Sequence, residues 1–547
     1  MRRPSAGLLA LGAIAAFVAA FAVLPAGTWF AQAVGPDPVS GPLPAALGSA
    51  GTRAAFRSSA IQGGLSAALA VALGYPAGVF LGRYRFVGRR AVRAALLLPF
   101  LLPGLVMVFG VLDLLGPTGV LGGPLPAARW FASGVPGIVA VNLFYNVPIV
   151  VVLTAAGCEA SSRTLEESVA SLGGGPWWAY RESWGAPSAV GAACGGLLTF
   201  VLSALSFAPP ILLCGNRCAT VEVEVYQLAE LAGEPRLAGA LALLLVAAFA
   251  APAIAYVLLA RRLRAARGAR YRPPPPAWNR PGTWALAAAF ALVVLAEGGL
   301  LAAVVVRSVL PPGGGPLAHG WSVLASPTTA ADLGIAPAAA VGNTFFFATL
   351  AAAVAVVVAV LSAYALARRP GAGPGLGLLV FVPLLLSPVV LAESLSRFWE
   401  PALGGPTNVW ILIVLSQALL AVPFALQSVE IPLGSLPRGA AEAAETLGAS
   451  RWGAFVDAEL PRIRRGLETA VLFGFALGLG EFTATNFFVS SGGSAGYRTL
   501  PVAIYVLAES PRLPGAADAA TAAAALLLFV SLGVFAAVVA GGGADAR

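Results

Sequence analysis

The sequence lacks lysine and carries little charge of either sign. Among 547 residues, lysine and arginine together number 33, all of them arginine, and charged residues make up only 10% of the chain. The absence of lysine excludes a P-loop lysine, a Schiff-base lysine and a lysine general base. A single histidine, His319, is too few for a histidine-rich metal or haem site, and four cysteines are too few for a disulfide scaffold.

Hydrophobic residues, in contrast, make up 59% of the chain. A soluble domain carries roughly 25% charged residues, so this composition indicates a multi-pass membrane protein. A membrane-crossing helix needs about 20 apolar residues, and twelve runs qualify. We therefore predict an all-α polytopic protein with about 12 transmembrane helices. The predicted spans are 7–30, 58–82, 94–115, 136–157, 188–213, 238–260, 284–306, 342–367, 374–396, 408–428, 466–489 and 517–541.

The arginines test this count. With twelve spans and the N-terminus inside, 24 of the 33 arginines fall in the inner segments. This bias follows the positive-inside rule and predicts that both termini are cytoplasmic. Basic loops facing anionic lipid also account for the net charge of +9, so no nucleic-acid partner is expected. Ala31-Gln32-Ala33 resembles a signal cleavage site, and whether the first run is ever cleaved stays open.

The chain reads as two copies of one template. Residues 1–260 and 284–547 each hold six predicted spans, and an Arg- and Pro-rich cytoplasmic linker, 261–283, joins them. The segment Pro235-Arg-Leu-Ala-Gly-Ala240 reappears as Pro511-Arg-Leu-Pro-Gly-Ala516. Because six is even, both copies start on the same side of the membrane, which makes them parallel repeats. A solute pathway between two such halves is the natural expectation.

The most informative pattern lies in two cytoplasmic loops, at about 163–187 and 436–464. In each loop an acidic residue precedes a glycine by six positions, and a proline follows a tryptophan by nine. A helix that breaks at glycine and a second short helix that runs to proline would form a compact elbow. The positions are Glu167, Gly173, Trp178 and Pro187 in the first loop, and Glu442, Gly448, Trp452 and Pro461 in the second.

The second loop resembles the E-A-A-x3-G signature of ABC-importer permeases, and the first is a degenerate copy. Two copies in one chain are similar to the fused permeases of thiamine and ferric-iron importers. The resemblance implies that each elbow is a coupling helix for a separate ABC ATPase, in two copies, and that an extracytoplasmic solute-binding protein delivers the solute. It implies no cofactor and no chemistry in the chain itself. The implied coupling residues are Glu167, Gly173, Gly174, Trp178, Glu442, Ala443, Ala444, Gly448, Arg451 and Trp452.

Carboxylates inside spans are costly and usually face the interior of a bundle. Glu481 lies within the eleventh span and Glu393 toward the outer end of the ninth. Both are predicted pathway residues, and Ser206 in the fifth span is placed with them. An acidic lining suits a cationic solute, with thiamine favoured and ferric iron next. The alternative for Glu481 is a purely structural carboxylate bonded to neighbouring hydroxyl groups.

Two other classes of protein fit the sequence less well. An ion-gradient-driven secondary transporter fits parallel six-span halves but has no use for paired cytoplasmic elbows. A membrane enzyme would need a catalytic cluster, which one histidine and scattered carboxylates do not supply. Cys214 and Cys218 form a C-x3-C pair in a predicted external loop. A disulfide between them and two free thiols both stay open.

Overall fold

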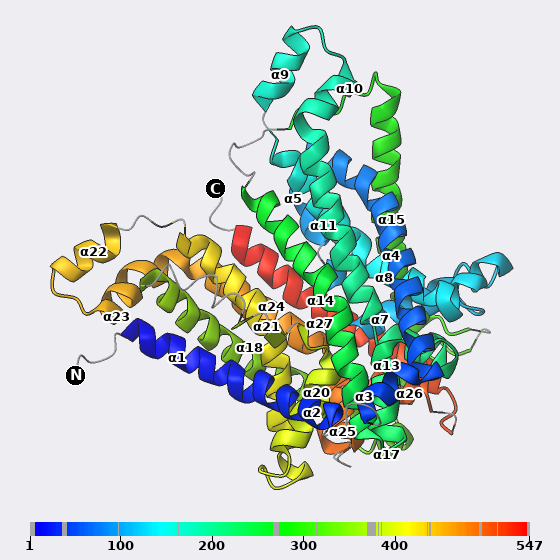
Figure 1. Cartoon of the computed structure of the whole chain (residues 1–547). Helices are drawn as coiled ribbons and strands as arrows, with labels where there is room; N and C mark the ends of the chain where they lie inside the picture. The colour runs from blue at the N-terminus through cyan, green and yellow to red at the C-terminus, as the bar shows by residue number, and fades with distance from the viewer. Residues whose placement is uncertain are drawn as a thin grey trace. The chain divides into compact units, whose positions relative to one another are not determined.

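The computed structural model describes residues 6–35, 41–96, 98–161, 163–265, 273–312, 315–368, 379–380, 382–383, 385–434, 436, 439–491, 495–510 and 512–543. Within these ranges the regular structure is helical and contains no strand (Figure 1). The all-α polytopic prediction is confirmed. The central part of the predicted linker, 266–272, lies outside the described residues.

Nine helices in the described ranges are long and apolar enough to cross a membrane. A tenth is obtained if the helices Arg451–Gly480 and Thr483–Ser490, which meet at 48°, form one bent span. The nine are Gly7–Val34, Ala50–Arg83, Gly134–Glu159, Trp177–Ala204, Pro235–Ala260, Pro281–Val309, Pro337–Leu366, Val409–Glu430 and Ala516–Ala537.

Two of the twelve predicted spans, 94–115 and 374–396, contain no helix in the described residues that is long enough to cross a membrane. In the first, α6 (Leu98–Leu101) ends before Pro103, and α7 (Gly104–Leu115) begins after it. Proline has no N–H to donate and keeps the preceding residue out of the helical region. In the second, α20 (Pro388–Trp399) starts with Ser387 as its N-cap. Twelve residues rise about 18 Å, which is too short for a hydrocarbon core of about 30 Å.

The first of two compact units comprises residues 1–46, 225–243 and 320–547. Within it, α1 packs on α18, and α2 packs on α20. The second-half helices of this unit are therefore joined by the opening helices of the chain. Its main helices are α1 (Ala6–Val18), α2 (Leu24–Val34), α18 (Pro337–Arg368), α20, α21 (Val409–Gly434), α24 (Arg464–Gly480), α25 (Thr483–Ser491), α26 (Leu500–Ala508) and α27 (Ala516–Gly543).

The second unit comprises residues 47–224 and 244–319. Its helix α15 (Pro281–Val309), which opens the second half of the sequence, packs on α4 and α7. Each unit thus takes the opening span of the other sequence half, an exchange that the repeat pattern did not predict. The other main helices are α4 (Ala50–Arg83), α8 (Gly134–Glu159), α11 (Gly185–Ala204), α12 (Ala208–Leu213) and α13 (Val221–Tyr226), with part of α14 (Pro235–Ala265).

Matching hydrogen bonds occur in the two units. In the second unit, the Ser59 hydroxyl on α4 accepts a hydrogen bond from the Val221 N–H that begins α13, at 3.0 Å. In the first unit, the Thr344 hydroxyl on α18 accepts one from the Leu500 N–H that begins α26, at 2.8 Å. These donors lie at helix starts, where N–H groups have no partner within their own helix. The template therefore repeats in individual contacts as well as in the order of spans.

Candidate functional site

The first elbow lies between α8 and α11. It consists of α9 (Arg163–Ser171), a turn at Gly173, α10 (Pro176–Ala179) and one π-helical turn, Tyr180–Trp184, that runs into α11. Gly173 has φ of 78°. Its N–H donates to the Ala170 carbonyl at 3.1 Å, and the Gly174 N–H donates to the Val169 carbonyl at 2.8 Å. This pair of bonds is a Schellman motif, which favours glycine because φ is positive.

The second elbow repeats this geometry between α21 and α24. It consists of α22 (Gly439–Thr446), a turn at Gly448 with φ of 93°, α23 (Arg451–Ala454) and the π-helical turn Phe455–Glu459. The Gly448 and Ala449 N–H groups donate to the carbonyls of Glu445 and Ala444, at 3.1 and 3.0 Å. Both loops therefore have the predicted two-helix shape, closed by the same motif.

The structure pairs the tryptophans differently from the sequence spacing. Because α10 and α23 begin at residues 176 and 451, Trp177 is the counterpart of Trp452. Trp178, which the spacing from proline favoured, comes one position later. From Trp177 to Pro187, the first loop is therefore one residue longer than the second loop is from Trp452 to Pro461.

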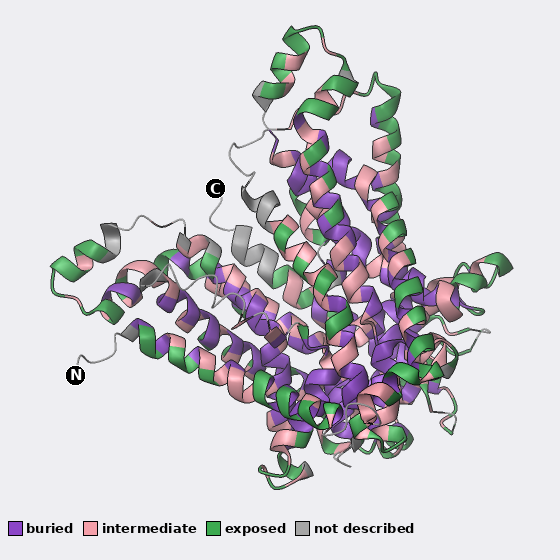
Figure 2. Cartoon of the chain, in the orientation of Figure 1, coloured by how far each residue is buried: buried purple, intermediate pink, exposed green. Residues whose placement is uncertain are grey.

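The elbows project away from the packed helices and are mostly exposed (Figure 2). Their tips carry Leu172 and Leu447, which are 87% and 89% exposed, each directly before the turn glycine. Neither leucine is among the coupling residues predicted from the sequence. Every predicted coupling residue is exposed or half-buried: Glu167, Gly173, Gly174, Trp178, Glu442, Ala443, Ala444, Gly448, Arg451 and Trp452.

Aromatic packing attaches the second elbow to the spans of its own unit. Tyr364, near the end of α18, is buried, and its ring meets those of Trp452 and Phe455 edge-on, with centroids 5.0 and 5.2 Å apart. Such pairs each contribute about 0.5–1.5 kcal/mol beyond simple burial. These rings fasten the second elbow to α18.

Glu481 lies at the bend between α24 and α25. Its carboxylate accepts hydrogen bonds from the N–H groups of Ala484 and Thr485, at 2.6 and 2.9 Å, and from the Thr485 hydroxyl at 2.5 Å. These bonds satisfy N–H groups that the break leaves without helical partners. The observed contacts of Glu481 are thus those of a helix cap, and its place on a solute pathway stays a prediction.

The other two predicted pathway residues lie in different surroundings. Glu393 is buried on α20 and forms an ion pair with Arg397. Ser206 lies in the second unit, at the break between α11 and α12, and its buried hydroxyl forms no hydrogen bond in the described structure. Glu481 and Glu393 belong to one unit, in which α20 packs on α25.

Glu230, a residue that the sequence analysis did not single out, lies near this acidic region of the first unit. It belongs to the π-helical turn Gln227–Leu231, outside the spans. The pKa of Glu230 is raised to about 7, mainly by burial and also by the nearby carboxylates of Glu393 and Glu400, while Arg397 acts to lower it. Within the described ranges, no three His, Cys, Asp or Glu residues are grouped so that they could hold a metal ion.

Two features lie in loops that the sequence predicts to be external. Cys214 and Cys218 form a disulfide around the short helix Gly215–Cys218, with their Cα atoms 5.8 Å apart, which settles the alternative left open by the sequence. In the first unit, helices α16 (His319–Leu324) and α17 (Pro327–Leu333) and the 512–514 segment border an open cavity of about 720 Å³. Asp332 and Arg512 supply its charged groups.

Comparison with known proteins places this geometry in a family. Residues 375–541 match the model of the binding-protein-dependent transport system inner membrane component. The chain is 28% identical over 498 residues to the thiamine transport system permease protein ThiP of Salmonella typhimurium, covering 86% of each chain. It is 27% identical to ThiP of Escherichia coli, covering 83% of this chain and 82% of that protein.

Other similar proteins match a shorter stretch of the chain, about one repeat long. The chain is 31% identical over 169 residues to the molybdenum transport system permease protein ModB of Haemophilus influenzae, covering 28% of this chain and 72% of that protein. Together with the paired elbows, these matches show that the chain belongs to the family of binding-protein-dependent transport system inner membrane components and is a multi-pass permease.

Proposed function

We propose that this permease is the translocating subunit of an ATP-driven importer, in which each elbow docks on one copy of a separate ABC ATPase. The observation that carries the proposal is the matched pair of exposed tips, Leu172 and Leu447, each followed by a glycine with positive φ. A fully exposed leucine gains about 1.5–3 kcal/mol on burial, so two such tips at the same register favour two equivalent apolar contacts. Two elbows in one chain imply two ATPase copies.

Two independent features support the proposed orientation. The arginine bias favours a cytoplasmic location for the elbows and both termini. The Cys214–Cys218 disulfide belongs to a loop predicted on the opposite side, and disulfides persist in oxidising compartments. We therefore propose a cytoplasmic-membrane protein whose 214–218 loop faces outward.

The favoured solute is thiamine, with ferric iron next. The relatives that match over most of the chain are named as thiamine permeases. A cationic solute also suits the carboxylates of Glu481 and Glu393. A solute-binding protein would deliver it to the outer face, where the cavity with Asp332 and Arg512 offers charges of both signs for docking.

We expect motion to be transmitted from each elbow to a break in the span that follows it. Each elbow continues without a loop into a span, α11 or α24, and each of these spans breaks further along, at residues 205–207 and 481–482. ATP-driven closure would move an elbow as a rigid body together with its span. The motion would then be absorbed at the breaks, where the helical hydrogen bonds are already interrupted. This is alternating access, with outward opening on ATP binding and inward reopening after hydrolysis.

A pull-down of the tagged chain from native membranes in mild detergent tests the proposal. We expect an ATPase subunit at about two copies per chain, and loss of that subunit when Leu172 and Leu447 are both replaced by Asp. Leu317→Asp is the matched control, since Leu317 is 71% exposed but lies in a predicted external loop. A preparation without ATPase that still takes up solute along an ion gradient would overturn the importer assignment in favour of a secondary transporter.

A further inference from the structure

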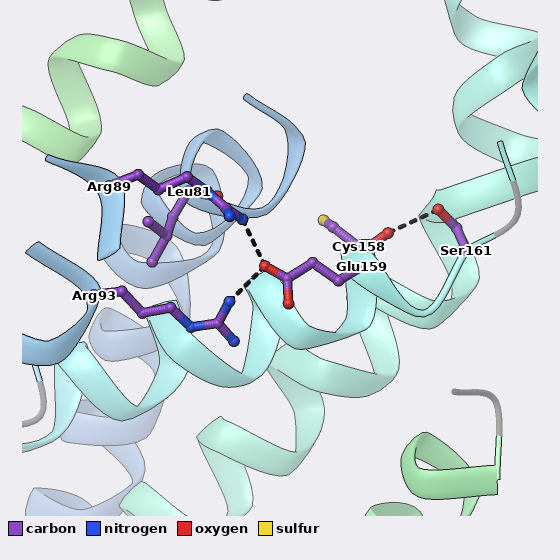
Figure 3. Close-up of polar contacts among 6 residues, drawn as sticks. All are labelled: Leu81, Arg89, Arg93, Cys158, Glu159 and Ser161. Carbon is purple, nitrogen blue, oxygen red and sulfur yellow. Dashed lines mark hydrogen bonds and ion pairs between the residues drawn. The ribbon is translucent and has the colours of Figure 1, made fainter. Parts of the chain in front are cut away.

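Charged side chains form ion pairs where the first elbow joins α8. Glu159, the last residue of α8, accepts hydrogen bonds from Arg89 and Arg93 of α5 (Arg89–Ala95), at 2.6 and 2.5 Å (Figure 3). Arg89 also donates to the Leu81 carbonyl of α4 at 2.8 Å, so α4, α5 and α8 are linked at one point. The Ser161 hydroxyl donates to the Cys158 carbonyl at 2.7 Å, at the end of α8. The elbow therefore leaves the span from a fixed point.

A second contact holds both arms of the same elbow. Arg83, the last residue of α4, forms an ion pair with Glu166 of α9. Its guanidinium carbon also lies 4.8 Å from the centre of the Trp184 ring, at the end of the other arm. The Arg83 and Glu166 side chains are only 13% and 20% exposed. An ion pair this sheltered is screened by salt less than a surface pair, and it connects three elements rather than one helix to itself.

The second elbow has no equivalent carboxylates. With Gly173 aligned to Gly448, the positions of Glu159 and Glu166 are occupied by Gly434 and Ala441. The described contacts of that elbow with α18 include the aromatic ones of Tyr364. The carboxylates that hold the first elbow are thus not repeated at the matching positions of the second.

We propose that Arg83, Arg89, Arg93, Glu159 and Glu166 form an ionic clamp that positions the first elbow, so that the elbow moves with α4 and α8 as one body. This rests on the proposed coupling function. The simpler alternative is that these arginines only neutralise charge at the ends of α4 and α8. That alternative explains charge at helix ends but does not explain why Arg83 contacts both arms of the elbow.

Spin-label distances test the clamp without any transport. Labels at Leu172→Cys and Val87→Cys report the elbow tip against the α4–α5 turn, because both side chains are highly exposed, at 87% and 102%. Of the native cysteines, Cys158 and Cys194 are buried and the other two are disulfide-bonded. We expect Glu159→Gln with Glu166→Gln to broaden the distance distribution. The control Glu468→Gln removes an exposed i,i+4 ion pair and should leave it unchanged. Equal widths in all three proteins would refute the clamp.

The coupling of transport to ATP hydrolysis is measured as the amount of thiamine taken up per ATP hydrolysed. The assay uses proteoliposomes that contain the permease, the ATPase and the binding protein. We expect the double Gln variant to retain the ATPase, because the tips are intact, and to lose about fivefold in this ratio. The charge swap Arg83→Glu with Glu166→Arg reverses this ion pair without removing it. We therefore expect the swap to keep part of the transport ratio that the double Gln variant loses. An unchanged ratio despite a broadened distribution would refute a positioning role. A parent protein that neither binds an ATPase nor moves thiamine would instead remove the proposed function, and the label widths would still decide whether the clamp exists.

Discussion

Replacement of Gly448 gives the sharpest test of the elbow geometry. Its φ of 93° lies where residues with a side chain rarely go, yet a Cβ added there would meet no atom within 4 Å. The cost of a side chain is therefore backbone strain and not a clash. For Ala this strain is about 1–2 kcal/mol, and a β-branched residue costs more, whereas Asn tolerates the left-handed region.

That strain sets the expected loss of affinity. If the ATPase binds only the elbow with positive φ at residue 448, a penalty of about 1–2 kcal/mol reduces the apparent affinity by about 5–30-fold. We expect the affinities to rank as Gly, Asn, Ala and then Val, with solute uptake following the same order. Gly173, with φ of 78° and equally open surroundings, should give the same ranking in the first elbow.

The assay is ATPase binding to the permease in lipid nanodiscs, by interferometry, with the amount of inserted protein measured in parallel. Gly342→Ala is the matched control, because Gly342 has equally open surroundings but lies within α18 without positive φ. That variant should bind as the parent does. If Gly448→Ala also binds as the parent does, or if Asn weakens binding as much as Val, the positive φ is not what the ATPase recognises.

Four further outcomes are expected. Leu447→Asp should lower ATPase affinity about 10-fold or more, measured in the same nanodiscs, because it removes a leucine that would become buried on docking. An unchanged affinity would exclude the tip from the interface. Because burial and neighbouring carboxylates raise the pKa of Glu230 to about 7, the folded state holds a proton there that the unfolded state loses above about pH 4.5. Stability should therefore fall as pH rises from about 4.5 to 7 and level off above, and Glu230→Gln should flatten this profile of Tm against pH. After reduction, a membrane-impermeant maleimide should label Cys214 in intact cells from outside, and a Cys214→Ser, Cys218→Ser pair should not react; labelling only after lysis would invert the topology. Glu481→Gln should keep part of the helix cap and of uptake while Glu481→Ala loses both; equal loss in the two would show that the negative charge itself is needed.

The elbows could be predicted from sequence because their signals are local. A helix ended by glycine, a short second helix and a proline require no knowledge of distant contacts. The tip leucines were missed because in a chain that is 59% hydrophobic a single leucine carries no signal until its exposure is known. The role of Glu481 as a cap was equally hidden, since it depends on a break in the span that the apolar run does not reveal.

In two of the predicted spans the described helices are short for a physical reason. Hydrophobicity alone does not distinguish a continuous helix from two short pieces separated by Pro103, or from a short helix that begins at Ser387 and Pro388. The exchange of opening spans between the compact units was also out of reach. It is decided by packing between segments hundreds of residues apart, for which one sequence offers no pattern.

The placement of α1 on α18 has a consequence for how this protein is assembled. The buried side chains of α1 and α2 are mostly small or medium, such as Ile14, Val18 and Ala33, but they include the large Trp29. In lipid no hydrophobic force drives such a helix to its partner, so association depends on close packing and on hydrogen bonds such as the one from the Trp399 indole to the Ala20 carbonyl. A single continuous polypeptide keeps the two at high effective concentration and in equal number. If the chain were cut within the linker 261–283, each fragment would keep a helix that belongs to the other's fold, and neither could mature without its complement.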